Sequence, residues 1–191
     1  MIRPLLLLMP LVTLAACNRA PEINEKNASV DEVAARVREA SGNASFVRAG
    51  EWQSKVVIEE FNIPGMPPEA IKQMKTAVAQ NQQHSFKTCL TAKDVKQPKG
   101  TFFTGNKQCR YDHFTMGNGK IDAAMRCPSG QGMTQKMVMS GTYGPERYDM
   151  RMTMTGEGVE GPIAKMTMTM RVESTRAGDC NPDTPSAKVA G

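Results

Sequence analysis

The residues with the most distinctive chemistry are methionines that alternate with polar residues in two segments. Residues 148–155 read Tyr-Asp-Met-Arg-Met-Thr-Met-Thr, and residues 165–171 read Lys-Met-Thr-Met-Thr-Met-Arg. Successive side chains of a strand point to opposite faces, so each segment places its methionines on one face. These methionines are Met150, Met152 and Met154 in the first segment and Met166, Met168 and Met170 in the second. Met137 and Met139 are candidates for a third row.

Three interpretations of this methionine surface stay open. Any half-buried antiparallel strand shows such alternation, so the face can be a plain hydrophobic core. Methionine is flexible and adapts to many shapes, which favours a pliable face for a lipid, an acyl chain or an apolar protein segment. Thioether sulfur also suits Cu(I), for which the candidate ligands are Met150, Met152, Met166 and Met168. Beyond that copper alternative we expect no cofactor.

The chain holds few residues arranged for catalysis. Its two histidines are His84, which precedes a serine, and His113, which follows an aspartate. Adjacent strand residues point to opposite faces, so neither pair forms a dyad by itself. There is also no G-x-S-x-G, no H-E-x-x-H and no phosphate-binding glycine loop. We therefore expect a protein that is not an enzyme.

Apart from Cys17, the chain has four cysteines, an even number that in an exported protein predicts two disulfides. They are Cys89, Cys109, Cys127 and Cys180, and none forms the C-x-x-C pair of zinc or thioredoxin-like sites. A three-residue hairpin loop over residues 117–119 sets Cys109 opposite Cys127 and leaves Cys89 for Cys180. A two-residue turn within the same segment shifts the register by one and points Cys109 and Cys127 to opposite faces. Both registers stay open.

The amino terminus carries a targeting pattern. Met1-Ile2-Arg3 is a short basic start, an apolar run over residues 4–14 follows, and Leu14-Ala15-Ala16 leads to Cys17. The run is shorter than the roughly 20 residues that span a membrane. The pattern resembles the signal of bacterial lipoproteins, which implies removal of residues 1–16 and acylation of Cys17 with chains such as palmitate. Asn18, where an Asp would favour retention at the inner membrane, favours the outer membrane.

The charge balance argues against a nucleic-acid partner. The chain has 24 basic and 19 acidic residues, a formal net charge of +5. The basic residues are spread along the chain instead of forming a dense run. The expected partners are therefore the membrane, through the lipid anchor, and a lipid or an envelope protein on the periplasmic side of the outer membrane.

A short helix is predicted before the main domain. Ser29 and Glu32 form the S-x-x-E pattern of a capping box, and apolar residues recur at helical spacing over about residues 30–40. We expect this helix to lie within a tether, residues 17–49, that lifts the domain off the membrane. The alternative is that its apolar face docks onto the domain.

The domain itself is predicted over residues 50–180, with a disordered tail over 181–191. Its strands are expected at about residues 51–62, 84–90, 107–116, 120–127, 133–143, 146–155 and 163–176, with a helix at about 68–81. Short turns between the later strands favour an antiparallel meander. We predict a mostly β fold of about seven strands, a curved sheet or small barrel with one helix inserted after the first strand.

Several short motifs occur together in this domain. It opens with Gly50-Glu51-Trp52, contains the four cysteines and the Met-Thr strands, and closes with Gly178-Asp179-Cys180. In this combination, over residues 50–180, the chain resembles a family of exported Gram-negative bacterial proteins known only as a domain of unknown function. The resemblance implies an envelope protein with paired cysteines, often a lipoprotein, and it implies no activity.

The expected function is accordingly that of a lipid-anchored envelope protein that binds an apolar ligand or another envelope protein. The alternatives are a structural envelope domain with a plain methionine core and a periplasmic Cu(I)-binding protein that uses its Met-x-Met strands.

Overall fold

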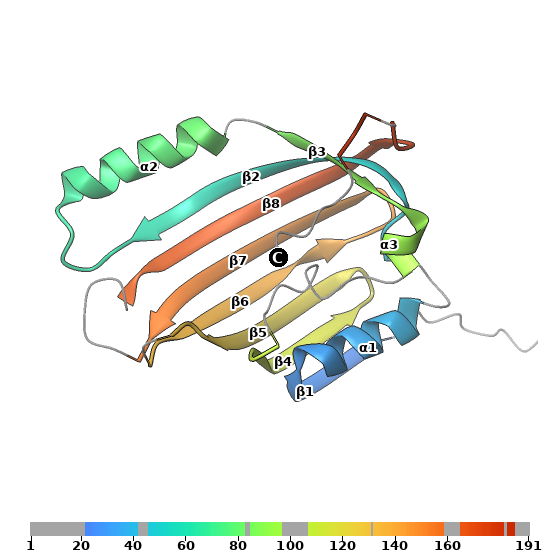
Figure 1. Ribbon diagram of the computed structural model, residues 1–191, viewed down its shortest axis with the longest axis horizontal. Coiled ribbons are helices and arrows are strands. Elements are labelled where there is room, and N and C mark those ends of the chain that lie inside the picture. Colours follow the sequence, from blue (N-terminus) through green and yellow to red (C-terminus); the bar gives the residue numbers. More distant parts are fainter. Residues whose placement is uncertain are drawn as a thin grey trace, which may run out of the picture.

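The computed structural model describes residues 22–41, 46–82, 85–96, 107–130, 132–158, 165–181 and 183–185. The predicted signal peptide and Cys17 lie outside these residues. The elements, in chain order, are β1 Ile23–Ser29, α1 Val30–Ser41, β2 Gly50–Asn62, α2 Pro68–Gln82, β3 Phe86–Leu90, α3 Ala92–Lys96, β4 Arg110–Gly117, β5 Lys120–Pro128, β6 Thr134–Tyr143, β7 Arg147–Glu157 and β8 Thr167–Gly178 (Figure 1). Within the described residues, no helix is long and apolar enough to span a membrane.

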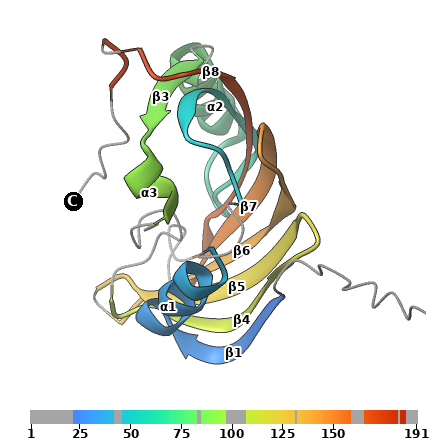
Figure 2. The same cartoon turned by 90° about the vertical axis from the view of Figure 1, so that its right-hand side faces the viewer.

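The strands form one eight-stranded antiparallel sheet in the order β1-β4-β5-β6-β7-β8-β2-β3. Strands β4 to β8 are neighbours in both sequence and space, which confirms the predicted meander. The sheet curls strongly, and α1 and α3 lie on its concave side (Figure 2). The mostly β prediction is thus confirmed in its curved-sheet form, with an eighth strand that the sequence did not predict.

The additional strand, β1, comes from the segment expected to be a tether. Residues 23–29 pair antiparallel with β4 along their length. The capping box predicted at the following helix is present: the Ser29 backbone N–H and hydroxyl donate to Glu32 Oε2 at 2.6 and 2.8 Å. In return the Glu32 N–H donates to Ser29 Oγ at 3.2 Å. The hydrogen bonds from Ser29 lower the pKa of Glu32.

Helix α1 docks onto the concave face of the sheet, the alternative that the sequence left open. Val33 and Val37 are fully buried, and they belong to one cluster with Tyr111 and Phe114 of β4. The rings of Tyr111 and Phe114 meet edge to face with their centroids 5.3 Å apart. A helix with one apolar stripe gains more by burying that stripe than by standing in water. Within the predicted tether of residues 17–49, residues 23–41 therefore form a packed β1–α1 unit.

The turn between β4 and β5 is the two-residue type. It consists of Asn118 and Gly119, whose φ angles of 51° and 73° suit a type I′ hairpin turn. In a ladder without a bulge, this turn would offset Cys109 from Cys127 by one residue, as expected from the sequence for a two-residue turn.

A β-bulge in β4 removes that offset. The register with β5 shifts by one residue between Tyr111 and His113, so Asp112 is the extra residue. Cys109 and Cys127 consequently face each other and form a disulfide. The pairing that a three-residue loop favoured is present, but the bulge and not the loop produces it.

Helix α2 runs beside the part of β2 that β3 leaves unpaired (Figure 1). β3 pairs only with residues 50–54 of β2, so the remaining edge of that strand is open to another element. Of the apolar residues of α2, Ile71 is half-buried and Met74 is 38 % exposed. Covering an edge strand in this way blocks pairing with other chains.

Residues after β8, predicted to be disordered, are in part ordered. Cys180 forms the second disulfide with Cys89 of β3. The Cys89 backbone N–H, on the outer edge of the sheet, donates to the Pro185 carbonyl at 2.9 Å. Edge backbone groups require partners, and the segment 183–185 supplies one. Residues 186–191 lie outside the described residues.

Candidate ligand-binding face

Methionines from three adjacent strands form a continuous surface on the concave side of the sheet. One cross-strand row runs from Met139 of β6 through Met152 of β7 to Met170 of β8, and the next runs through Met137, Met154 and Met168. Residues directly opposite each other on paired strands, and residues two apart in one strand, lie on the same side of a sheet, so all six share a face. We call these six residues the methionine face.

The two other predicted methionines lie at its margins. Met150 lies opposite Val172 of β8 and packs against the core under α1. Met166 precedes β8, outside the ladder. The candidate copper ligands Met150, Met152, Met166 and Met168 are therefore not directly opposed to one another; the opposed pairs are Met152 with Met170 and Met154 with Met168.

The methionine face is half-buried along its whole extent. Two other methionines on the same concave face are much more protected: Met116 of β4 and Met125 of β5 are 6 % and 3 % exposed in the cluster beneath α1. Met137 and Met139 pack against that cluster from its side. The face thus begins where the buried core ends, and its side chains keep partial access to the solvent.

Strand β2 extends both rows. Ile58 lies opposite Met170, and Phe61 lies opposite Met168. Phe61 is three positions after Ile58 in the sequence, where a regular strand would need two, because the register shifts between Ile58 and Glu60. Alternation in β2 indicates Ile58 as an inward residue, but no pattern in the sequence reveals the bulge that also brings Phe61 inward.

One polar side chain reaches this apolar surface. The Gln135 Nε2 group donates to the Met154 sulfur at 3.7 Å. Gln135 lies two residues before Met137 in β6, opposite Gly156, so its side chain is on the same face and beside the second row. A thioether is a weak acceptor, so this amide is available to a stronger one.

The opposite face of the same strands is polar. The Arg171 guanidinium donates to both carboxylate oxygens of Asp149, at 2.9 and 2.5 Å, and these hydrogen bonds lower the pKa of Asp149. Thr153 and Thr169 are hydrogen-bonded across the strands at 3.1 Å. The sheet is therefore amphipathic, with its apolar side turned toward the concavity.

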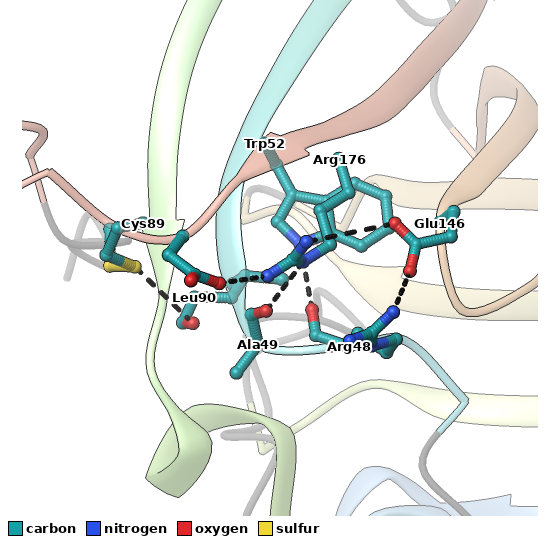
Figure 3. A network of polar contacts seen from close by, with 9 residues as sticks. Arg48, Ala49, Trp52, Cys89, Leu90, Glu146 and Arg176 are labelled. Atoms are coloured by element: carbon teal, nitrogen blue, oxygen red, sulfur yellow. Dashed lines mark hydrogen bonds and ion pairs between the residues drawn. A yellow bond between two sulfur atoms is a disulfide. The ribbon is translucent and has the colours of Figure 1, made fainter.

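A polar network closes one end of the concave face (Figure 3). The indole N–H of Trp52, which is 1 % exposed, donates to the Arg48 carbonyl at 3.0 Å. The Arg176 guanidinium donates to the Ala49 carbonyl at 2.8 Å and lies 4.0 Å from the Glu146 carboxylate. Glu146 in turn binds the Arg48 guanidinium at 2.5 Å. These contacts hold the start of β2 against the β6–β7 turn.

The motifs that open and close the domain meet at the same end. Glu51 of β2 lies opposite Gly178 of β8. The Glu51 carboxylate binds Lys87 Nζ at 2.8 Å and accepts a hydrogen bond from the Thr184 hydroxyl, and both contacts lower its pKa. The residues that carry the family resemblance here build the structure of the domain end.

The histidine that the structure describes lies on the outer face. His113 Nε2 is 2.7 Å from the Asp122 carboxylate on the neighbouring strand, and the two side chains are 38 % and 59 % exposed. His84 lies outside the described residues. Among the described residues, no three or more His, Cys, Asp and Glu side chains come together as a group that could hold a metal ion.

The fold and this face define a class of protein: a single curled antiparallel sheet, stapled by two disulfides, with an apolar concave side. Residues 47–180 match the family described as "Protein of unknown function (DUF3617)", and the chain belongs to this family. Neither the curated proteins nor the solved structures contain a significant match to the chain. The match begins after α1, so the β1–α1 unit that completes the core lies outside it.

Proposed function

We propose that the protein is a non-enzymatic binding module whose methionine face holds an apolar ligand, such as an acyl chain. The carrying observation is that six thioether side chains in two cross-strand rows are half-buried beside the buried core beneath α1. β-branched and aromatic residues suit strands better than methionine does. Six methionines in such positions favour a surface that adapts to its ligand.

The expected affinity follows from the area that remains to be covered. Burying a methionine side chain completely contributes about 1.5–3 kcal/mol. At most about a third of each of the six remains exposed, so covering them would contribute at most about 3–6 kcal/mol before the entropy of association is subtracted. A micromolar dissociation constant corresponds to about 8 kcal/mol. We therefore expect micromolar or weaker binding.

The proposed lipid anchor would hold the domain close to a bilayer. Only residues 18–22 separate Cys17 from β1, because β1 begins at Ile23. Five residues and their flanking bonds reach at most about 20 Å. With Cys17 acylated, the domain would lie at the membrane surface instead of being lifted off it. Membrane lipid or the apolar segment of an envelope protein would then be the nearest ligand.

The test is a titration of the disulfide-intact protein with a fluorescent palmitate analogue. Wild type should show saturable binding, and Met152→Gln/Met170→Gln should weaken it about tenfold or more, because two amides without partners replace apolar contacts. Met74→Gln, at an exposed position of α2, is the matched control and should bind as wild type does. Absence of saturable binding to wild type, or equal loss in the control, would contradict the proposal.

Cu(I) binding is a second candidate, supported by the direct opposition of Met152 to Met170 and of Met154 to Met168. Adjacent strands lie about 4.8 Å apart, so opposed thioethers are close enough to share a soft cation. Met152→Leu/Met170→Leu separates the two candidates because leucine keeps the surface apolar and removes the sulfur. If Cu(I) affinity in a competition assay with a chromogenic chelator is the same in wild type and this variant, the copper candidate is wrong.

A further inference from the structure

We propose that the methionine face is a site of reversible oxidation, at which conversion of thioethers to sulfoxides releases the ligand. This inference rests on the proposed function. The oxidant is a peroxide: its O–O bond breaks, one oxygen forms an S–O bond with the methionine sulfur, and the other leaves as water. The sulfur loses two electrons and the peroxide gains them. The product is a polar, chiral sulfoxide that methionine sulfoxide reductases return to the thioether.

Exposure distinguishes the methionine face from the buried methionines of the core in this reaction. Its six side chains are partly accessible, whereas Met116 and Met125 on the same sheet are almost completely buried beneath α1. The described cysteines are held in the Cys89–Cys180 and Cys109–Cys127 disulfides, so no thiol among them competes for peroxide. Oxidation should therefore reach the six methionines of the face well before Met116 and Met125.

The two rows should respond differently. Met152 and Met170 lie in a row whose other members, Ile58, Met139 and Ala123, are all apolar. A sulfoxide oxygen there introduces a strong acceptor into an apolar surface and weakens every contact with an apolar ligand. At Met154 the Gln135 amide already donates to the sulfur at 3.7 Å, so a sulfoxide oxygen meets a donor. Loss of binding should therefore follow oxidation of Met152 and Met170.

The experiment treats the disulfide-intact protein with hydrogen peroxide and follows each methionine by peptide mass spectrometry. The six face methionines should oxidise at least about ten times faster than Met116 and Met125. The affinity for the fluorescent palmitate analogue should fall about tenfold or more in parallel with sulfoxide at Met152 and Met170. Treatment with the two reductases, one for each sulfoxide epimer, should restore it.

Met152→Leu/Met170→Leu is the matched control, because it keeps both positions apolar and removes the reactive sulfurs. Compared with its own affinity before treatment, this variant should retain most of its probe binding after peroxide treatment. An equal loss in this variant would overturn the release step. If the face methionines oxidise no faster than Met116 and Met125, the modification site is refuted even where the probe binds. Selective oxidation of a wild-type protein that never binds the probe would refute the proposed function, and with it the release step.

Discussion

Replacement of Gly50 by alanine is expected to loosen the end of the domain where β2, β3 and β8 meet. A Cβ atom built on Gly50 would lie 2.3 Å from the Gly178 carbonyl oxygen and 2.5 Å from Arg176 Nε. The φ angle of Gly50 is +145°, a conformation that residues with a side chain rarely adopt. Neither obstacle is a flexible tip: one is backbone, and the other is a guanidinium held by the Ala49 carbonyl at 2.8 Å and by Asp179 at 2.6 Å.

The loss of stability has two parts. Holding a residue with a side chain at a sparsely populated backbone conformation costs about 1–3 kcal/mol. Forcing one carbon into a packed site costs about 1–3 kcal/mol more. The Gly50→Ala variant should therefore lose about 2–6 kcal/mol in the free energy of unfolding, a large part of the 5–15 kcal/mol typical of a domain.

Gly65→Ala is the matched control. Its φ angle is +84°, and a Cβ atom there would meet nothing within 4 Å, so it carries the conformational part alone. Both variants are unfolded in guanidinium chloride with their disulfides intact. The shift of the midpoint at constant slope gives the difference between their free energies of unfolding. A difference of about 1–3 kcal/mol is expected from the contacts with Gly178 and Arg176. Equal destabilisation of the two variants would refute the role assigned to those contacts.

Three further predictions follow from contacts in the same structure. Ser29→Ala should remove the hydroxyl contacts of the capping box and lower stability by about 1 kcal/mol. The Ser29 backbone N–H, the larger cause of the lowered Glu32 pKa, remains, so that pKa should rise only part of the way toward 4.5 in an NMR titration; an unchanged value would argue against the Ser29 hydroxyl contact. Because a lowered carboxyl pKa stabilises the fold above the ordinary value, stability should decline as the pH falls below about 4.5. Replacing Cys89 and Cys180 by alanine removes the closure of a 91-residue loop and should cost about 4.6 kcal/mol of stability. Replacing Cys109 and Cys127 removes the closure of an 18-residue loop and should cost about 3.2 kcal/mol. Calorimetry that finds the reverse order would contradict the chain-entropy account. Burial raises the pKa of Tyr111 from 10.0 to about 12, so stability should fall as the pH rises from 10 to 12, and Tyr111→Phe should remove that part of the fall in alkaline unfolding curves.

Features that depend on neighbouring residues in the sequence were predictable. The cap at Ser29 and Glu32, the turn after β4 and the two alternating methionine segments each need only a few adjacent residues. Alternation with period two states which methionines share a face before any partner strand is known. The inward position of Met152, Met154, Met168 and Met170 could therefore be stated from the sequence alone.

The failures concern segments whose state depends on distant partners. Residues 23–29 are polar and do not alternate, so nothing local predicts a strand; they form β1 because β4 offers an unpaired edge and α1 buries its apolar stripe beside it. Likewise, bulges at Asp112 and near Glu59 shift the register by one residue each. A bulge is decided by what must be packed on the two faces, and this is known only when both strands are in place.

The sequence by itself determined the alternation of the methionines, because side-chain parity is a local property of an extended chain. Tertiary structure decided that Met152 lies between Met139 and Met170 and that the two rows continue to Ile58 and Phe61. It also decided that the buried cluster beneath α1 stops short of the face. It also reduced the stretch between Cys17 and the folded domain to residues 18–22. The strand register, the extent to which α1 covers the sheet and the pairing of β1 with β4 all depend on contacts between residues far apart in the chain. Such contacts form only in the folded molecule.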